Sequence, residues 1–216
     1  MTLFLHTYQF FTQHPGTIWR HTLQQLYLVA IPLAAAILVA VPLTMLATRV
    51  RQLYGPVMGF ANAMQTIPSL ALLALMIAIG LGIGVLPAVL ALFLYALMPI
   101  VRNTYVGIMG VDPGVKDAAR GMGVTSWQLL WMVELPLALH VIIAGIRSAL
   151  VATIGFATLA SLIGAGGLGS LIMEGMGLAS NSIVLAGTIP AIVLAFLAEG
   201  LMGRVERVLT PRGLRA

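Results

Sequence analysis

The sequence predicts an all-α, polytopic membrane protein with five membrane-spanning helices, built as one domain over residues 1–216. Of its residues, 60% are hydrophobic and only 8% are charged, whereas a soluble domain carries about 25% charged residues. The mean hydropathy is +1.05. The charges lie between long uncharged runs, and no linker or low-complexity segment divides the chain.

Long uncharged runs predict the spans in order, because about 20 apolar residues cross a hydrocarbon core of about 30 Å. No Asp, Glu, Lys or Arg occurs from His21 to Thr48, which predicts the first span. The next uncharged run has fifty residues, from Gln52 to Val101, and is long enough for two spans. The stretch GLGIGVLP at 80–87 predicts the turn between them. The five predicted spans are about 24–47, 57–79, 85–101, 138–163 and 183–202.

The positions of Lys and Arg predict the orientation, because cytoplasmic loops are enriched in these residues. With the N-terminus outside, Arg20 is the one basic residue in an outer segment, and Arg147 falls within the fourth span. The inner segments then hold nine basic residues: Arg49, Arg51, Arg102, Lys116, Arg120, Arg204, Arg207, Arg212 and Arg215. The C-terminus and the polar loop at about 112–136 are therefore expected to be cytoplasmic.

The first half of this polar loop predicts a short helix. Asp112 followed by Pro113 is typical of a helix start, because the carboxylate caps free N–H groups and proline is tolerated at the first position. Asp117 and Arg120 form an i,i+3 pair of opposite charge. The helix is expected to end at the glycines at 121 and 123.

The second half predicts an amphipathic helix capped by Thr125 or Ser126 and closed by Pro136 before the fourth span. Two interpretations of the loop stay open on physical grounds. Trp127 and Trp131 can anchor an interfacial helix at the lipid headgroups. Alternatively, the alanines and glycines at 118–123 form a small-residue surface that a partner protein can approach closely.

The loop resembles the EAA loop of ABC importer permeases. The matching residues are Asp117-Ala118-Ala119, Gly123, Val133 and Leu135-Pro136, with Asp in place of Glu and Val in place of Ile. Longer stretches at 63–75, 94–123, 133–139 and 144–169 are similar to permeases for glycine betaine, carnitine, choline and related quaternary amines. His140 departs from the proline expected there in those relatives. The resemblance covers about residues 25–205.

The resemblance implies a type I ABC importer (MetI-like) fold and a permease subunit in a bacterial inner membrane. It implies two ATP-binding subunits, a second permease chain that is identical or homologous, and an extracytoplasmic substrate-binding protein. ATP and magnesium would be held by the ATPase, with no cofactor in this chain. The ATPase-coupling residues would be Lys116, Asp117, Ala118, Ala119, Arg120, Gly121, Met122 and Gly123. A methionine or other amino-acid importer, or a secondary transporter without an ATPase, remains the alternative.

The sequence does not indicate an enzyme. A P-loop needs Gly-Lys-Ser/Thr, but the one lysine, Lys116, follows Val115. GAGGLG at 164–169 follows an apolar helix and has no acidic residue at the required distance, so it predicts a turn rather than a nucleotide site. The four histidines lack ligand spacing, so no metal site is expected. Nucleic acid is not an expected partner, because the basic residues are dispersed between spans. Membrane lipid is an expected partner.

Several polar or helix-breaking residues inside the spans are candidates for the translocation pathway. Gln65, Thr66, Pro68 and Ser69 form a polar, kinked patch in the second span, which transport helices use to expose backbone groups. Arg147 is the fifth candidate, since an intramembrane arginine usually faces a wet cavity. Ordinary packing of the patch and snorkelling of Arg147 to the headgroups are the alternatives. Glu199 is expected to pair with Arg204.

Overall fold

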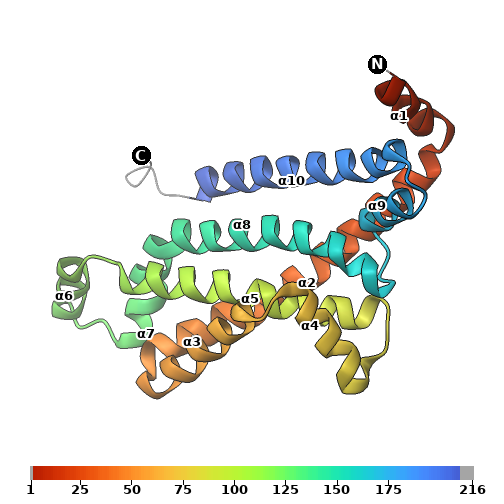
Figure 1. Ribbon diagram of the computed structural model, residues 1–216. Helices are drawn as coiled ribbons and strands as arrows, with labels where there is room; N and C mark the ends of the chain where they lie inside the picture. The colour runs from red at the N-terminus through yellow and green to blue at the C-terminus, as the bar shows by residue number, and fades with distance from the viewer. Residues whose placement is uncertain (1, 210–216) are drawn as a thin grey trace.

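The computed structural model describes residues 2–209, and the regular elements within them are all helices (Figure 1). The predicted all-α class is therefore confirmed. Arg212 and Arg215, counted among the inner basic residues, lie outside the described residues. The elements are α1 Thr2–Gln13, α2 Pro15–Arg49, α3 Arg51–Thr66, α4 Ser69–Met76, η1 Ile77–Leu81, α5 Val85–Met109, α6 Pro113–Gly121, α7 Ser126–Leu129, η2 Leu130–Glu134, α8 Leu135–Leu159, η3 Ala160–Ile163, α9 Leu168–Gly177 and α10 Asn181–Leu209.

Four continuous helices are long and apolar enough to cross a membrane, and they correspond to the predicted first, third, fourth and fifth spans. They cover Pro15–Arg49, Val85–Met109, Ser126–Ile163 and Asn181–Leu209. Each extends beyond its predicted bounds, because polar residues at the ends of a run can stay helical outside the hydrocarbon core.

The second span differs from the single helix predicted over 57–79. Two helical segments, Arg51–Thr66 and Ser69–Leu81, meet at an angle of 101°, so the fifth candidate span is a broken one. Pro68 explains the break, since a proline disfavours helical dihedrals in the residue before it. Ile67 is extended, with φ −71° and ψ 124°. The glycine turn that follows is present between Leu81 and Val85, and α5 begins at Val85, as predicted for the third span.

The fourth span also differs from prediction, because Pro136 does not close the preceding helix. The chain is helical without a gap from Ser126 to Ile163. Proline has no N–H to donate within a helix. Just before Pro136, the five residues of η2 adopt π-helical geometry, and the Leu135 N–H bonds to the Leu130 carbonyl. This wider turn lets the helix run through the proline.

Two helices were not anticipated from the sequence, namely α1 and α9. The predicted glycine turn is present before α9, where Gly164, Gly166 and Gly167 have positive φ values of 75°, 87° and 79°. The α9 helix then lies between α8 and α10 at very close range. A Cβ on Gly169 would fall 2.0 Å from the Thr158 carbonyl oxygen, so glycine is required there.

The centre of the bundle is formed by α2, α5 and α8, which pack against one another along their lengths (Figure 1). Their shared core contains Ala36, Ala40, Ala96, Ile100 and Ala149, all nearly inaccessible. Small residues let these helices approach closely, as expected in membrane bundles. By contrast, α10 packs on the outside and buries Ala186 and Gly187.

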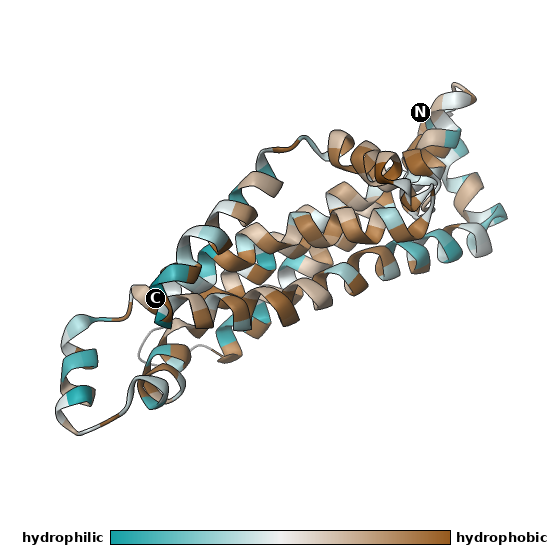
Figure 2. Cartoon of the chain, turned by 90° about the horizontal axis from the view of Figure 1, so that it is seen from below, coloured by the Kyte–Doolittle hydropathy of each residue, from teal (hydrophilic) through white to brown (hydrophobic). Residues whose placement is uncertain are grey.

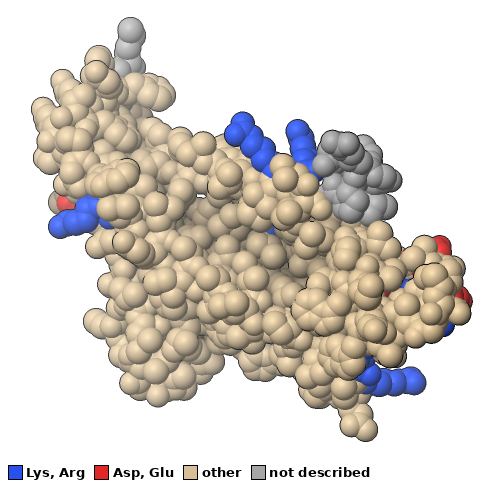
Figure 3. Space-filling view, turned by 180° about the vertical axis from the view of Figure 1, so that it is seen from behind, with Lys and Arg blue, Asp and Glu red and all other residues tan. Residues whose placement is uncertain are grey.

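The molecule has two distinct ends. We call the polar loop at about 112–136 the coupling loop, after the role expected of it. The coupling-loop end of the molecule comprises the α2–α3 junction and α6, α7 and η2 (Figure 1). The glycine-turn end comprises the start of α2 and residues 160–169. The long helices are mostly hydrophobic, whereas hydrophilic residues gather on α6 and near the helix ends (Figure 2). Charged side chains lie at the margins of a broad uncharged face (Figure 3). An uncharged middle between polar ends is what a bilayer requires.

Candidate functional site

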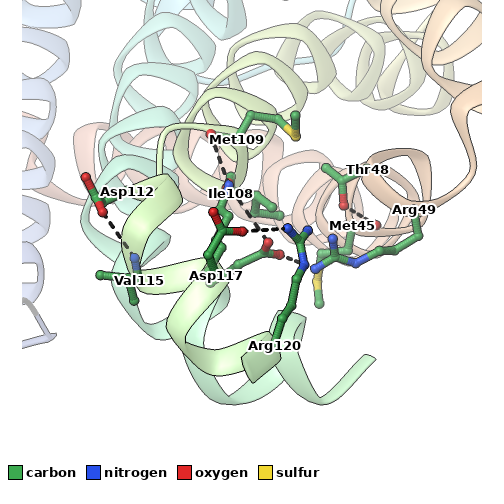
Figure 4. Close-up of polar contacts among 11 residues, drawn as sticks. Met45, Thr48, Arg49, Ile108, Met109, Asp112, Val115, Asp117 and Arg120 are labelled. Atoms are coloured by element: carbon green, nitrogen blue, oxygen red, sulfur yellow. Dashed lines mark hydrogen bonds and ion pairs between the residues drawn. The ribbon is translucent and has the colours of Figure 1, made fainter. Parts of the chain in front are cut away.

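The coupling loop projects from one end of the bundle, and its first helix is α6. The Asp112 side chain accepts a hydrogen bond from the Val115 N–H at 3.1 Å, and Pro113 occupies the first helical position (Figure 4). The helix ends at Gly121, and Gly123 has a φ of +82° that favours glycine. The predicted start and end of this helix are both confirmed.

The predicted coupling residues divide between two faces of α6. Asp117 and Arg120 form the expected i,i+3 ion pair at 3.1 Å, with side chains 71% and 60% exposed (Figure 4). The exposed members of the set are Asp117, Ala118, Arg120, Gly121, Met122 and Gly123. Ala119 is buried, and the Lys116 side chain is only 13% exposed. The helix therefore presents charged and small residues outward and turns its lysine inward.

The inward face of α6 meets a buried carboxylate, Glu134, whose side chain is 3% exposed. The Lys116 Nζ lies 3.8 Å from Glu134 Oε1 and donates to the Ile108 and Met109 carbonyls at 3.2 Å each. Arg49, the last residue of α2, donates from Nη2 to Glu134 Oε2. Figure 4 shows Arg49 reaching from α2 toward the loop. We call Arg49, Lys116 and Glu134 the buried charge network.

The second half of the loop begins with the predicted cap. Thr125 and Gln128 form a reciprocal capping box, with the Thr125 side chain accepting from the Gln128 N–H at 3.3 Å. Trp127 and Trp131 are 51% and 58% exposed, whereas Leu130 is fully buried. Exposed tryptophans suit contact with lipid headgroups, so the interfacial interpretation of this half stays a prediction beside the small-residue surface predicted at 118–123.

The predicted pathway residues in the second span lie at its break. Gln65 and Thr66 end α3 and are exposed, as is Pro68, while Ser69 begins α4 and is half-buried. The Tyr95 hydroxyl of α5 donates to the Ile67 carbonyl, which the break leaves without a helical partner. An aromatic side chain from the neighbouring helix therefore satisfies a carbonyl at the break.

Arg147 lies apart from that patch. Its guanidinium pairs with two carboxylates of α10: Nε donates to Glu199 at 2.8 Å and Nη1 to Glu206 at 3.1 Å. These three side chains line one cavity between α8 and α10. Ser69 instead lines a small cavity beside Tyr95 and Phe156. Glu199 pairs with Arg147 rather than with Arg204 as expected.

Two members of the buried charge network were not among the predicted site residues. Arg49 was counted for topology, and Glu134 was assigned to the amphipathic helix without a partner. A lone acid in the otherwise apolar run LLWMVELPLAL at 129–139 was the available signal, because a carboxylate is seldom fully buried without a paired cation. Among residues 2–209, no group of three or more His, Asp or Glu side chains is placed to hold a metal ion.

The bundle matches a solved structure titled "Inward facing conformations of the MetNI methionine ABC transporter". The TM-score is 0.82 at 24% identity, and the match covers 91% of this chain and 97% of that chain. The expected MetI-like fold is confirmed. The match shows the fold: a helical bundle with four continuous candidate spans and one broken one, and a projecting loop that contains α6 and α7.

Residues 40–210 match the family model described as binding-protein-dependent transport system inner membrane component, and the chain belongs to this family. It is 45% identical to the osmoprotectant import permease protein OsmW of Salmonella typhimurium, covering 97% of this chain and 99% of that one. It is 45% identical to the carnitine transport permease protein OpuCB of Listeria monocytogenes, over 95% and 94%. It is 41% identical to the choline transport system permease protein OpuBB of Bacillus subtilis, over 97% and 96%. The chain is thus the membrane permease component of an ABC importer, and its relatives are transport permeases rather than enzymes.

Proposed function

We propose that this permease imports compatible solutes such as glycine betaine, carnitine or choline, driven by ATP hydrolysis in a partner subunit. The names of full-length relatives, carnitine and choline permeases at 41–45% identity, support this cargo class. The likeness to the methionine transporter concerns the fold, at 24% identity, and does not favour methionine as cargo.

The observation that carries the coupling role is the outward face of α6. Its exposed side chains combine an ion pair, Asp117 with Arg120, and small residues that allow close approach. Two ATP-binding subunits would dock on two such helices, one from each permease chain, and would hold the ATP and magnesium. Binding of ATP then supplies the difference in affinity between two conformations that any switch requires.

We propose that the coupling-loop end faces the cytoplasm. The α2–α3 junction, α6 and the end of α10 lie toward the same end of the bundle, and these segments carry most of the basic residues (Figure 1). An excess of Lys and Arg is typical of cytoplasmic segments. The glycine-turn end would then meet the extracytoplasmic binding protein, and the N-terminus would lie outside.

For the pathway we propose the exposed residues at the break of the second span, Gln65, Thr66 and Pro68, together with Ser69 and Arg147. A broken span supports this, because non-helical backbone at membrane depth is tolerated where it lines protein or a wet cavity. The chain has no cysteine, so single cysteines at 65, 66 and 69 can be tested directly. We expect choline to protect them from a water-soluble thiol reagent.

The central test is uptake into proteoliposomes holding the permease, its ATPase and its binding protein. Labelled glycine betaine, carnitine or choline should accumulate only with ATP, and excess methionine should not compete. Uptake driven by an ion gradient without ATP would contradict the proposal.

Docking is tested by co-purification of the ATPase with permease variants. Gly121→Trp adds bulk to the outward face of α6 where a Cβ would meet nothing within 4 Å, so the permease itself should stay intact. Gly177→Trp is the matched control, at an equally open position on α9. We expect the ATPase to be lost from the first variant and retained by the second. Retention by both would contradict docking on this face.

A further inference from the structure

The buried charge network is the strongest feature that the proposed function does not use. It joins several elements through three side chains. Lys116 of α6 contacts both Glu134 and the last carbonyls of α5. Glu134 in turn binds Arg49 at the end of α2 and continues directly into α8. The contacts therefore connect the coupling helix to the ends of three membrane helices.

Little else attaches α6 to the bundle. Its one buried residue is Ala119, and burial of a single methyl group contributes little hydrophobic free energy. The hydrogen bonds of Lys116 are charge-assisted and satisfy carbonyls that would otherwise be unpaired at the end of α5. The position of α6 relative to the spans is thus set mainly by charge.

Glu134 is the one group of the network that both cations approach: Arg49 donates to it, and Lys116, held by two α5 carbonyls, lies 3.8 Å from it. Arg49 Nε is buried and has no hydrogen-bond partner among the described residues, so the Arg49 head group relies on the bond from Nη2 to Glu134. Without the carboxylate, Arg49 and Lys116 would be two cations facing a neutral side chain. No charged contact would then link the end of α2 to α6.

We propose that Glu134 is a positioning residue that passes the movement of α6 to α2, and that it does so by holding Lys116 and Arg49 at once. This inference rests on the proposed function, because it assumes that an ATPase moves α6. Asp117 and Arg120 meet the motor on the outer face of the helix, and the buried network on the inner face transmits the displacement. Coupling of this kind needs a continuous set of contacting groups that have discrete arrangements. Paired charges supply them, because an ion pair is either formed or broken.

The test uses the complete complex of permease, ATPase and binding protein in proteoliposomes, and measures ATP hydrolysed per solute imported. Glu134→Gln keeps the shape and removes the charge. We expect ATPase binding and hydrolysis to persist while the ratio rises about tenfold, within the usual range of coupling between sites. Asp112→Asn is the matched control, because it removes one charge from the same loop and keeps a good helix cap; its ratio should stay at the wild-type value.

A wild-type ratio in Glu134→Gln would overturn the inference and leave the proposed function intact. If the wild-type complex imports solute without ATP, the proposed function itself fails. If Glu134→Gln does not assemble, Arg49→Met and Arg49→Lys replace it, since both keep Glu134 beside Lys116. Uncoupling by Met with coupling retained by Lys supports the inference. Equal coupling in those two variants contradicts it.

Discussion

The two ends of the bundle are joined by different chemistry. At the glycine-turn end, the buried Gln25 amide accepts from the Leu168 N–H and donates to the Ile154 carbonyl, both at 3.1 Å. These contacts are neutral and involve the backbone. At the coupling-loop end, two cationic side chains from separate elements, Arg49 and Lys116, meet at one carboxylate, Glu134.

The difference between main-chain packing and side-chain ion pairs indicates which contacts can adjust. Main chains press together where α9 packs on α10, next to the glycine-turn end: a Cβ on Gly187 would lie 2.8 Å from the Leu168 carbonyl oxygen, and one on Gly175 would lie 2.5 Å from the Val184 nitrogen. Close-packed backbone has no room to slide. Lys116 and Arg49 instead bridge their elements through long, rotatable side chains. We infer that α9 is fixed against α8 and α10, whereas the links from Arg49 and Lys116 to Glu134 are adjustable.

The largest expected effect on stability comes from the charged end. Glu134→Ala leaves two cations without their shared partner, and removing one member of a buried ion pair typically costs about 3–5 kcal/mol. Unfolding in mixed detergent micelles measures this loss. A loss below about 1 kcal/mol, as for an exposed ion pair, would show that the network is solvated and would weaken the comparison.

A smaller loss is expected at the neutral end from Gln25→Leu. The Leu168 N–H loses its partner, and an orphaned buried donor costs about 1–3 kcal/mol. The Ile154 carbonyl lies within α8 and keeps its helical partner. Gln24→Leu is the matched control, because Gln24 is exposed and makes a longer bond of 3.3 Å to the Gly167 N–H. Equal losses in the two variants would contradict the assigned role of Gln25.

The close approach of α9 to α8 predicts opposite changes in stability for two glycine substitutions. Gly169→Ala should destabilise by about 1–3 kcal/mol, as overpacking does, because the new Cβ would overlap the Thr158 carbonyl. Gly155→Ala should instead stabilise by up to about 1 kcal/mol, since it lies within α8 with open space around it. Thermal unfolding of both variants in detergent measures the contrast; a shift in the same direction would contradict it.

The smallest effect on stability is expected on the outer face of α6. Asp117→Ala breaks an ion pair in which both side chains are more than half exposed, and such pairs contribute about 0.2–1 kcal/mol. We still expect weaker ATPase binding in co-purification, because this face is the proposed docking surface. A large loss of stability would mean that the two faces of the helix are not separable.

Much of this fold follows from the sequence because uncharged runs and helix caps act locally. The runs around α2, α5, α8 and α10 predict the long helices, and Asp112 with Pro113 predicts the start of α6. Pro68 predicts a break in the second span, but the angle of 101° depends on packing against α5. Continuity through Pro136 depends on a π turn that no local signal indicates.

The division of α6 into two faces could not be derived from its sequence. Lys116 and Asp117 are adjacent, so a turn of about 100° per residue separates them on the helix, but the sequence does not say which one faces the bundle. The α5 carbonyls and Glu134 decide this, and both come from other elements. The partners of Arg147 were missed for the same reason, since Glu199 and Glu206 are about fifty residues away.

The continuous helix from Ser126 to Ile163 has a consequence for the lipid. Its 38 residues at a rise of about 1.5 Å each reach about 57 Å, nearly twice the thickness of a hydrocarbon core of about 30 Å. A helix longer than the hydrocarbon core adapts to a thicker or thinner bilayer by changing its tilt. The depth of the coupling loop relative to the headgroups is therefore set in part by the acyl chain length of the surrounding membrane.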